Sequence, residues 1–147
     1  IHKRSVESAN DTASTKSCLQ EVIQEYSLTG DIIMLYLTYP ERLWEDVIKS
    51  YEWYIKTSAK SMLCREECKI HPYVHLYDIG DDYGRQIVEH DLYRRQDYPT
   101  CFKICHIITI FKTTELNNFI PILGILYLLS HSVDVDNLVD FEKIKTQ

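Results

Sequence analysis

The chain has 147 residues, of which 45% are hydrophobic and 26% charged, and its formal net charge is −6. This size and composition fit one globular domain with a buried core. The Lys and Arg residues are scattered, whereas nucleic-acid binding needs a concentrated positive face, so we exclude a nucleic-acid partner. The longest apolar stretch, residues 119–129, is too short for a spanning helix of roughly 20 residues, so we expect no membrane insertion.

The N-terminal third begins with a polar segment. Residues 1–14 contain little that can be buried, so we expect a flexible arm there. A first helix is predicted from Thr15 or Ser17, whose hydroxyls can cap it, through an apolar stripe that includes Tyr26. The apolar segment 32–37 is predicted as a short buried helix, and a strand is the alternative.

Residues 40–70 have the pattern of one long helix. Pro40 suits a first helical residue, and the pair His71–Pro72 would end the helix. Between them, residues recur at alternating steps of four and three positions, which is typical of a helix face packed on a core. This stripe consists of Trp44, Ile48, Tyr51, Ile55, Ser58 and Met62.

Four further helices are predicted in the second half of the chain. Apolar residues recur there at helical spacing, Pro99 opens one segment, and the pair Asn117–Asn118 closes it. The expected ranges are 85–96, 99–111, 120–129 and 137–144.

Together these elements predict an all-α fold, a disulfide-cross-linked helical bundle of about six helices. Residues 15–147 are expected to form a single helical domain. A tyrosine followed by basic residues precedes each of two cysteine pairs, at about 40–70 and about 85–113. This similarity fits two degenerate helical repeats, and chance resemblance between amphipathic helices is the alternative.

Five cysteines give the sharpest sequence signal. Cys64 and Cys68 form one pair, Cys101 and Cys105 another, each with three intervening residues. On a helix this spacing puts both sulfurs on one face, one turn apart. Antiparallel packing would join Cys64 to Cys105 and Cys68 to Cys101, and we favour this pairing; parallel packing would give 64–101 and 68–105. Cys18 is left over as a buried free thiol, with an intermolecular bridge as the alternative.

Metal binding and catalysis are not expected. The set Cys64, Cys68, His71 and His75 lacks the long spacer of a zinc finger, and a four-cysteine site would require a reducing compartment. The neighbours Cys105 and His106 point about 100° apart on a helix, which does not suit a nucleophile and its base. No phosphate-binding glycine loop or calcium loop is present in the sequence. We therefore predict no metal, no cofactor and no enzymatic activity.

Several short signals favour a secreted protein. The start at Ile1 and the dibasic pair Lys3–Arg4 are expected of a processed product, and Asn10-Asp11-Thr12 is an N-glycosylation acceptor pattern. Stable disulfides also belong to oxidising compartments.

Cysteine and tyrosine order adds a family resemblance. The chain has eleven tyrosines and two successive cysteine–tyrosine–cysteine runs, Cys18…Tyr54…Cys64 and Cys68…Tyr93…Cys101. Over about residues 18–105 this order resembles the bicycle family, secreted salivary effectors of gall-forming aphids. The resemblance implies a protein that alters host development by binding an unknown host protein, and it assigns no functional residue.

A carrier of small apolar ligands, like helical salivary or odorant-binding proteins of insects, is the alternative function. The apolar segments 104–111 and 120–129 favour it, but the cysteine spacing differs from the six-cysteine odorant-binder pattern. For either function we expect a monomer.

Overall fold

The computed structural model describes residues 2–118, 125–128 and 134–145. Over these residues the fold is mixed α/β, so the predicted all-α bundle of about six helices is wrong. Its elements are α1 (Thr15–Tyr26), β1 (Asp31–Met34), α2 (Trp44–Thr57), β2 (Ser61–Glu67), η1 (Pro72–Val74), β3 (Leu76–Gly80), β4 (Tyr83–Gln86), η2 (Arg95–Asp97), β5 (Phe102–Lys112), η3 (Thr113–Asn118), β6 (Ile125–Leu128) and α3 (Leu138–Lys145).

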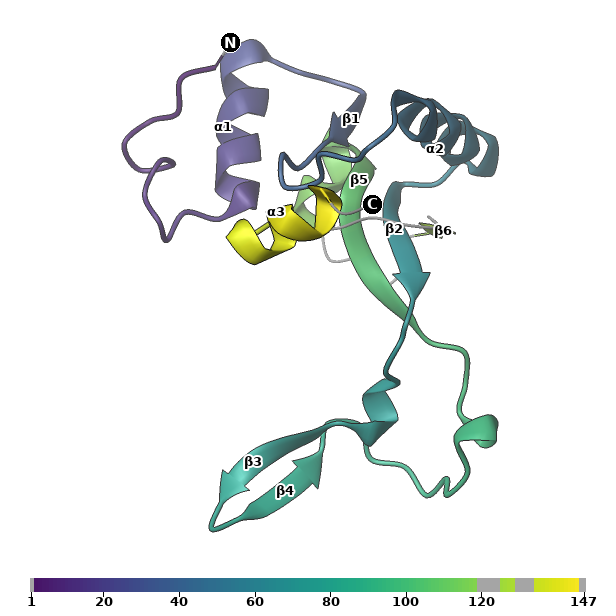
Figure 1. Cartoon of the computed structure of the whole chain (residues 1–147). Helices are drawn as coiled ribbons and strands as arrows, with labels where there is room; N and C mark the ends of the chain where they lie inside the picture. The colour runs from purple at the N-terminus through teal and green to yellow at the C-terminus, as the bar shows by residue number, and fades with distance from the viewer. Residues whose placement is uncertain (1, 119–124, 129–133, 146–147) are drawn as a thin grey trace.

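A four-stranded sheet in the order β1-β5-β2-β6 forms the body of the molecule. β5 runs antiparallel to both β1 and β2, and β6 pairs with β2 in parallel. The hairpin of β3 and β4 forms a separate two-stranded sheet that projects away from α1, α2 and α3 (Figure 1). The hydrophobic core is made of Tyr39, Val47, Tyr54, Ala59, Met62, Cys64, Cys105, Ile107, Ile108 and Ile110.

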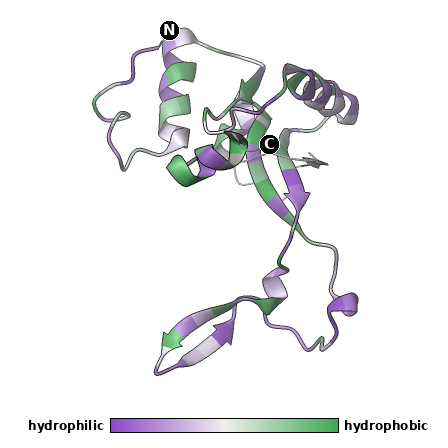
Figure 2. Cartoon of the chain, in the orientation of Figure 1, coloured by the Kyte–Doolittle hydropathy of each residue, from purple (hydrophilic) through white to green (hydrophobic). Residues whose placement is uncertain are grey.

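The segment 99–111, predicted as a helix, forms strand β5 instead. Its run from Ile107 to Phe111 is apolar at almost every position, and each of these residues is buried. A central strand covered on both faces needs such a run, and β-branched side chains fit it better than a helix. Figure 2 shows hydrophobic residues concentrated on β5 in the body.

The long helix predicted over 40–70 is right only as far as Thr57. Ser58 adopts a left-handed conformation, with φ 53°, and its N–H bonds to the Ile55 carbonyl. The next N–H, that of Ala59, bonds to the Tyr54 carbonyl, so the helix closes with a C-terminal cap. The chain then enters β2, and Met62 lies in a strand.

The face that α2 buries also differs from the predicted one. The buried residues are Val47, Ser50 and Tyr54. Of the helical residues in the predicted stripe, Trp44, Ile48 and Ile55 point to solvent. Tyr51 lies at the edge of the buried face, and its hydroxyl donates to Asp31 at 3.4 Å. The sequence pattern identified an apolar stripe correctly but assigned it to the wrong side of the helix.

Two helices are confirmed at the ends of the chain. α1 is capped by Ser14, whose Oγ accepts from the Ser17 N–H at 3.0 Å, one residue before the expected cap. α3 begins after Asn137, whose Oδ1 accepts from the N–H of Val139 at 2.9 Å. The segment 32–37 contains strand β1, as the alternative prediction had it.

The other predicted helices are corrected where the structure describes them. The range 85–96 contains the end of β4 and the short turn η2. Within 120–129, the described residues Ile125–Leu128 form β6, and the remainder lies outside the described part. The segments 40–70 and 85–113 therefore share no helical structure. No helix in the described ranges has the length and apolar character to cross a membrane.

Candidate functional site

The four paired cysteines lie on neighbouring strands. In the antiparallel ladder of β2 and β5, Cys64 stands directly opposite Cys105. The same register carried to the end of the ladder sets Cys68 opposite Cys101, and the Cys68 N–H bonds to the Cys101 carbonyl at 3.3 Å. Side chains alternate between the faces of a strand, so all four sulfurs lie on one face.

An ion pair lies between the cross-strand pair Cys64–Cys105 and the cross-strand pair Cys68–Cys101. Glu66 and Lys103 are opposite each other on the same face, with their charged groups 3.0 Å apart. The Glu66 carboxylate raises the pKa of Lys103. On the other face, the Arg65 guanidinium lies 3.8 Å from the centre of the Phe102 ring.

The register is compatible with both bridges. Directly opposed residues of an antiparallel ladder have Cα atoms about 4.5–5.5 Å apart, within the range of about 4.4–6.8 Å seen in disulfides. The structure holds all five cysteines as thiols and not as disulfides, so the bridges 64–105 and 68–101 stay a prediction.

Electrostatics make Cys64 and Cys101 poor nucleophiles. Burial, with the neighbouring Cys105 adding to it, raises the pKa of the Cys64 thiol to about 12. Burial and Cys68 also raise the pKa of Cys101. A reactive cysteine needs a lowered pKa, so this arrangement favours structural roles over thiolate catalysis.

The extended strand also argues against the zinc alternatives. Cys64 lies in β2 and Cys68 directly follows it, and a separation of four residues corresponds to about 13 Å along a strand. One zinc ion binds sulfur at about 2.3 Å, so a single ion cannot reach both residues. Neither the four-cysteine set nor the set with His71 and His75 can therefore surround one ion.

The two remaining sequence candidates lie near α1. The Cys18 thiol is half-buried and donates to the Ser8 carbonyl at 3.3 Å. Asn10 is exposed, and its side-chain oxygen accepts from the Thr12 N–H at 2.9 Å. The free thiol and the glycosylation site both stay predictions.

One cluster near the N-terminus has metal-ligand chemistry. Nitrogen and oxygen atoms of His2, Glu21 and Glu25 lie within 4.8 Å of one another. The His2 ring uses different nitrogens toward the two carboxylates, Nε2 toward Glu21 at 3.2 Å and Nδ1 toward Glu25 at 2.9 Å. A metal ion would bind one ring nitrogen of His2, whereas here each nitrogen faces a different carboxylate, so the arrangement does not match a metal site.

Docking of residues 2–8 on α1 is expected to weaken in acid. Hydrogen bonds from Ser8 and Ser5, and the nearby His2, lower the pKa of Glu21. A lowered carboxyl pKa means that the stabilisation is complete above the ordinary Glu value and is lost as pH falls through the lowered one. Following the Ser5 amide signal by NMR from about pH 6 to about pH 3 should show release, and Glu21→Gln should release the segment at neutral pH. Glu7→Gln, an exposed carboxylate of the same segment, serves as the control, and equal behaviour of both variants would contradict this prediction.

Between β2 and β5 the chain forms an excursion over residues 69–100, which we call the arm. Figure 1 shows it projecting from the end of the ladder, with the β3–β4 hairpin farthest from the body. Cys68 and Cys101 stand at its base, where the chain leaves and rejoins the ladder.

Four aromatic rings pack at the centre of the arm. Tyr73 stacks on His90 with ring centres 4.3 Å apart, and Tyr98 contacts both edge-on. His71 contacts Tyr98 and accepts the Tyr73 N–H at Nδ1, while its Nε2 lies 2.9 Å from the Pro99 carbonyl. Nδ1 is an acceptor, so Nε2 carries the proton and donates. These contacts tie the outgoing and returning halves of the arm together.

The β3–β4 hairpin was missed in the sequence. Gly80, Asp81 and Asp82 all have positive φ, and two central turn residues of this kind match the twist of a hairpin. The signal was there: a Gly-Asp-Asp turn lies between Tyr- and Ile-containing segments of alternating polarity.

One face of the hairpin is apolar and exposed. Tyr77 pairs with Arg85, and Tyr83 and Ile87 alternate with Arg85 onto the same face. Ile79 follows two residues after Tyr77, at the register shift between Asp78 and Gly80. We call these five residues the hairpin face. Its four apolar members are between 44% and 70% exposed.

The opposite side of the hairpin is different. It carries Asp78, Gly84 and Gln86, with Leu76 lying against Gly84. A Cβ added at Gly84 would stand 3.3 Å from the Leu76 side chain, and Leu76 itself is 62% exposed. The hairpin is thus amphipathic although both sides face solvent.

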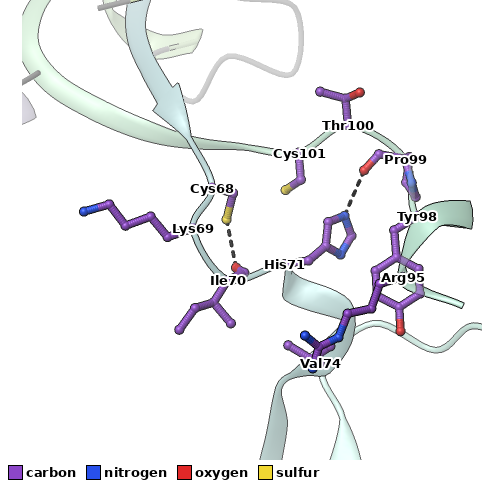
Figure 3. Close-up of a pocket in the computed structure, with 10 residues that line it drawn as sticks. All are labelled: Cys68, Lys69, Ile70, His71, Val74, Arg95, Tyr98, Pro99, Thr100 and Cys101. Carbon is purple, nitrogen blue, oxygen red and sulfur yellow. Dashed lines mark hydrogen bonds between the residues drawn. The ribbon is translucent and has the colours of Figure 1, made fainter. Parts of the chain in front are cut away.

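A cavity of about 560 Å³ lies at the base of the arm, between residues 68–74 and 95–101. Figure 3 shows His71 and Tyr98 beside it, with Cys68 and Cys101 at its upper end. Its lining includes the ionisable side chains of Lys69, His71 and Arg95.

Fold and site together define a small mixed α/β protein with a cysteine ladder and a projecting aromatic arm. A comparison with known protein families found no match, and no curated protein matched the sequence. The functional conclusion therefore depends on the residues themselves.

Proposed function

We propose that this protein is a secreted, non-enzymatic effector that binds a host protein through the hairpin face. The observation that carries the proposal is the exposure of four large apolar side chains around Arg85 on one face of a projecting hairpin. Contiguous exposed apolar surface on a monomer marks interaction sites.

The composition of the hairpin face supports a protein partner. Tyr and Arg are enriched among residues that dominate binding energy, because they combine large contact area with hydrogen bonding. Tyr77, Tyr83 and Arg85 offer this combination, and two isoleucines add apolar area. The mixed charge of the arm, with Asp81 and Asp82 at its tip, suits a protein better than a polyanion.

The cysteines at the base of the arm favour both parts of the proposal, binding through the hairpin face and secretion. A two-stranded hairpin alone is marginally stable in water, so this one depends on the aromatic cluster and on a closed base. A bridge between Cys68 and Cys101 would limit the arm's freedom before binding and reduce the entropic cost of association. Such a bridge persists only in an oxidising compartment.

The alternative, a carrier of apolar ligands, has less support. A carrier needs an enclosed cavity with a mostly apolar lining. The cavity at the arm base contains Lys69, His71 and Arg95, and its residue Ile70 is largely exposed to solvent. We therefore favour the binding protein.

A quantitative pull-down tests the proposed function. The oxidised protein is immobilised, exposed to host tissue extract, and compared with Tyr77→Ser/Tyr83→Ser by mass spectrometry. A specific host protein should be retained by the wild type, and its affinity should fall on the order of 100-fold in the double variant, since two central aromatic contacts are lost.

The matched control changes the opposite side of the same hairpin. Leu76→Ser/Gln86→Ser should retain the partner, and circular dichroism should show that both variants keep the fold. Equal retention by all three proteins, or no retained host protein, would refute binding through the hairpin face.

A further inference from the structure

α2 presents an apolar stripe that the rest of the described chain leaves exposed. Trp44, Ile48, Tyr51 and Ile55 are between 36% and 69% exposed. We call these four residues the α2 seam. About a quarter turn away on the helix, Val47, Ser50 and Tyr54 are buried and fix it on the body. At the near edge of the stripe, the Tyr51 hydroxyl also donates to Asp31 at 3.4 Å. The seam therefore cannot rotate inward without losing the buried residues of the same helix.

The spacing of the seam identifies the kind of partner. Its members follow one another at intervals of four, three and four residues, the period of the a and d positions of a coiled coil. A strict stripe of this kind is narrower than a face packed on a globular core and matches a second helix. The 14 residues of α2 give a contact about 21 Å long.

We propose that α2 pairs in antiparallel orientation with α2 of a second copy of this chain. The two-fold arrangement that centres the seam sets Trp44 against Ile55 of the second copy, and Ile48 against its Tyr51. Every contact then combines an aromatic with an aliphatic side chain, which allows close packing. Parallel pairing would instead set Trp against Trp and Tyr against Tyr.

Charges beside the seam permit this pairing. Glu45, Lys49, Glu52 and Lys56 follow the outer edge of the stripe with alternating sign. In the antiparallel arrangement, Glu52 of one copy lies between Glu45 and Lys49 of the other along the helix axis. The edge is therefore close to neutral and does not repel a second copy.

The contact is small, so the dimer is weak. Two helices of this length bury an area on the order of 1,000 Å², the lower limit for a specific interface. We expect a dissociation constant on the order of 10–100 µM. Each dimer would carry two arms, and the pairing is independent of what the arms bind.

Sedimentation equilibrium between about 1 µM and about 300 µM, a range that brackets the expected constant, tests the proposal, with a non-reducing gel to exclude covalent dimers. The wild type should shift from monomer to dimer across this range. Ile48→Glu should remain monomeric and folded, because Ile48 is 47% exposed in the monomer. Lys49→Ala, outside the seam, should dimerise like the wild type.

The double variant Ile48→Glu/Tyr51→Lys tests the orientation. Antiparallel pairing sets the new carboxylate at position 48 against the new ammonium group at position 51 of the second copy, in both directions, so the double variant should associate more strongly than Ile48→Glu alone. Parallel pairing would set carboxylate against carboxylate and ammonium against ammonium, and the protein would stay monomeric. A monomeric wild type at the highest concentration, an Ile48→Glu variant that dimerises like the wild type, or a double variant that associates no more strongly than Ile48→Glu would each overturn the proposal.

Discussion

Reduction of the oxidised protein is expected to lower its free energy of unfolding by about 4 kcal/mol. The bridge between Cys64 and Cys105 closes a loop of about 42 residues, and in the chain-entropy model a loop of this length contributes about that much. The second bridge contributes less, because the first already holds the strands together. Urea denaturation with and without reductant measures the difference.

The bridge between Cys68 and Cys101 should be reduced before the bridge between Cys64 and Cys105. Cys64 and Cys105 are 0% and 4% exposed, whereas Cys68 and Cys101 are half-buried at the base of the arm. A disulfide is attacked by an incoming thiolate, so access decides the rate. Mild reductant with alkylation and mass analysis should label Cys68 and Cys101 first.

Variants separate the two bridges from other effects of reduction. Cys64→Ala/Cys105→Ala should lose less unfolding free energy than full reduction, since the bridge between Cys68 and Cys101 still closes most of the loop. Cys18→Ala should leave the effect of reductant unchanged. A non-reduced protein with four free thiols at these positions, or equal stability with and without reductant, would contradict the ladder of bridges.

The cysteine spacing predicted Cys64 opposite Cys105, although the two segments are strands and not the predicted helices. A spacing of four residues returns a side chain to the same face in a helix, with its period of 3.6, and also in a strand, with its period of 2. In an antiparallel arrangement the first cysteine of one pair meets the second of the other pair in both cases. The cysteine spacing therefore predicts Cys64 beside Cys105 whether the two segments are helices or strands.

Elsewhere this ambiguity misled the prediction. The segment around Ile107–Phe111 satisfies a helical stripe because almost all its residues are apolar, and only its β-branched composition favours a strand. Cap geometry at Ser58 decided where α2 ends, and serine in a left-handed conformation has no strong local signal. The hairpin had its turn signal in Gly80 to Asp82, but it buries no apolar face in the body, so no core pattern supported it.

The buried side of α2 is expected to hold the helix on the sheet mainly through Tyr54. Tyr54 is 1% exposed, and its hydroxyl donates to Asp31 at 3.1 Å on the neighbouring strand β1. Lys112 of β5 donates to the same carboxylate oxygen at 3.1 Å, so one group links helix and sheet. Burial and the carboxylate raise the pKa of Tyr54 and keep it a neutral donor. Tyr54→Ala should cost about 3–5 kcal/mol of unfolding free energy, because it removes a buried ring and leaves a cavity.

Two variants on the same helix make this result specific. Tyr54→Phe keeps the ring and should cost about 1.5–3 kcal/mol, the value of a hydrogen bond to a charged acceptor. Ile55→Ala, measured at about 1 µM to avoid self-association, should cost less than about 0.5–1 kcal/mol since Ile55 is 51% exposed. If Ile55→Ala proved the more damaging of the alanine variants, the helix would bury the stripe that its sequence suggests, and the α2 seam would not be a surface. The relative cost of these two neighbouring side chains therefore decides which face of α2 holds the fold and which is free to meet another molecule.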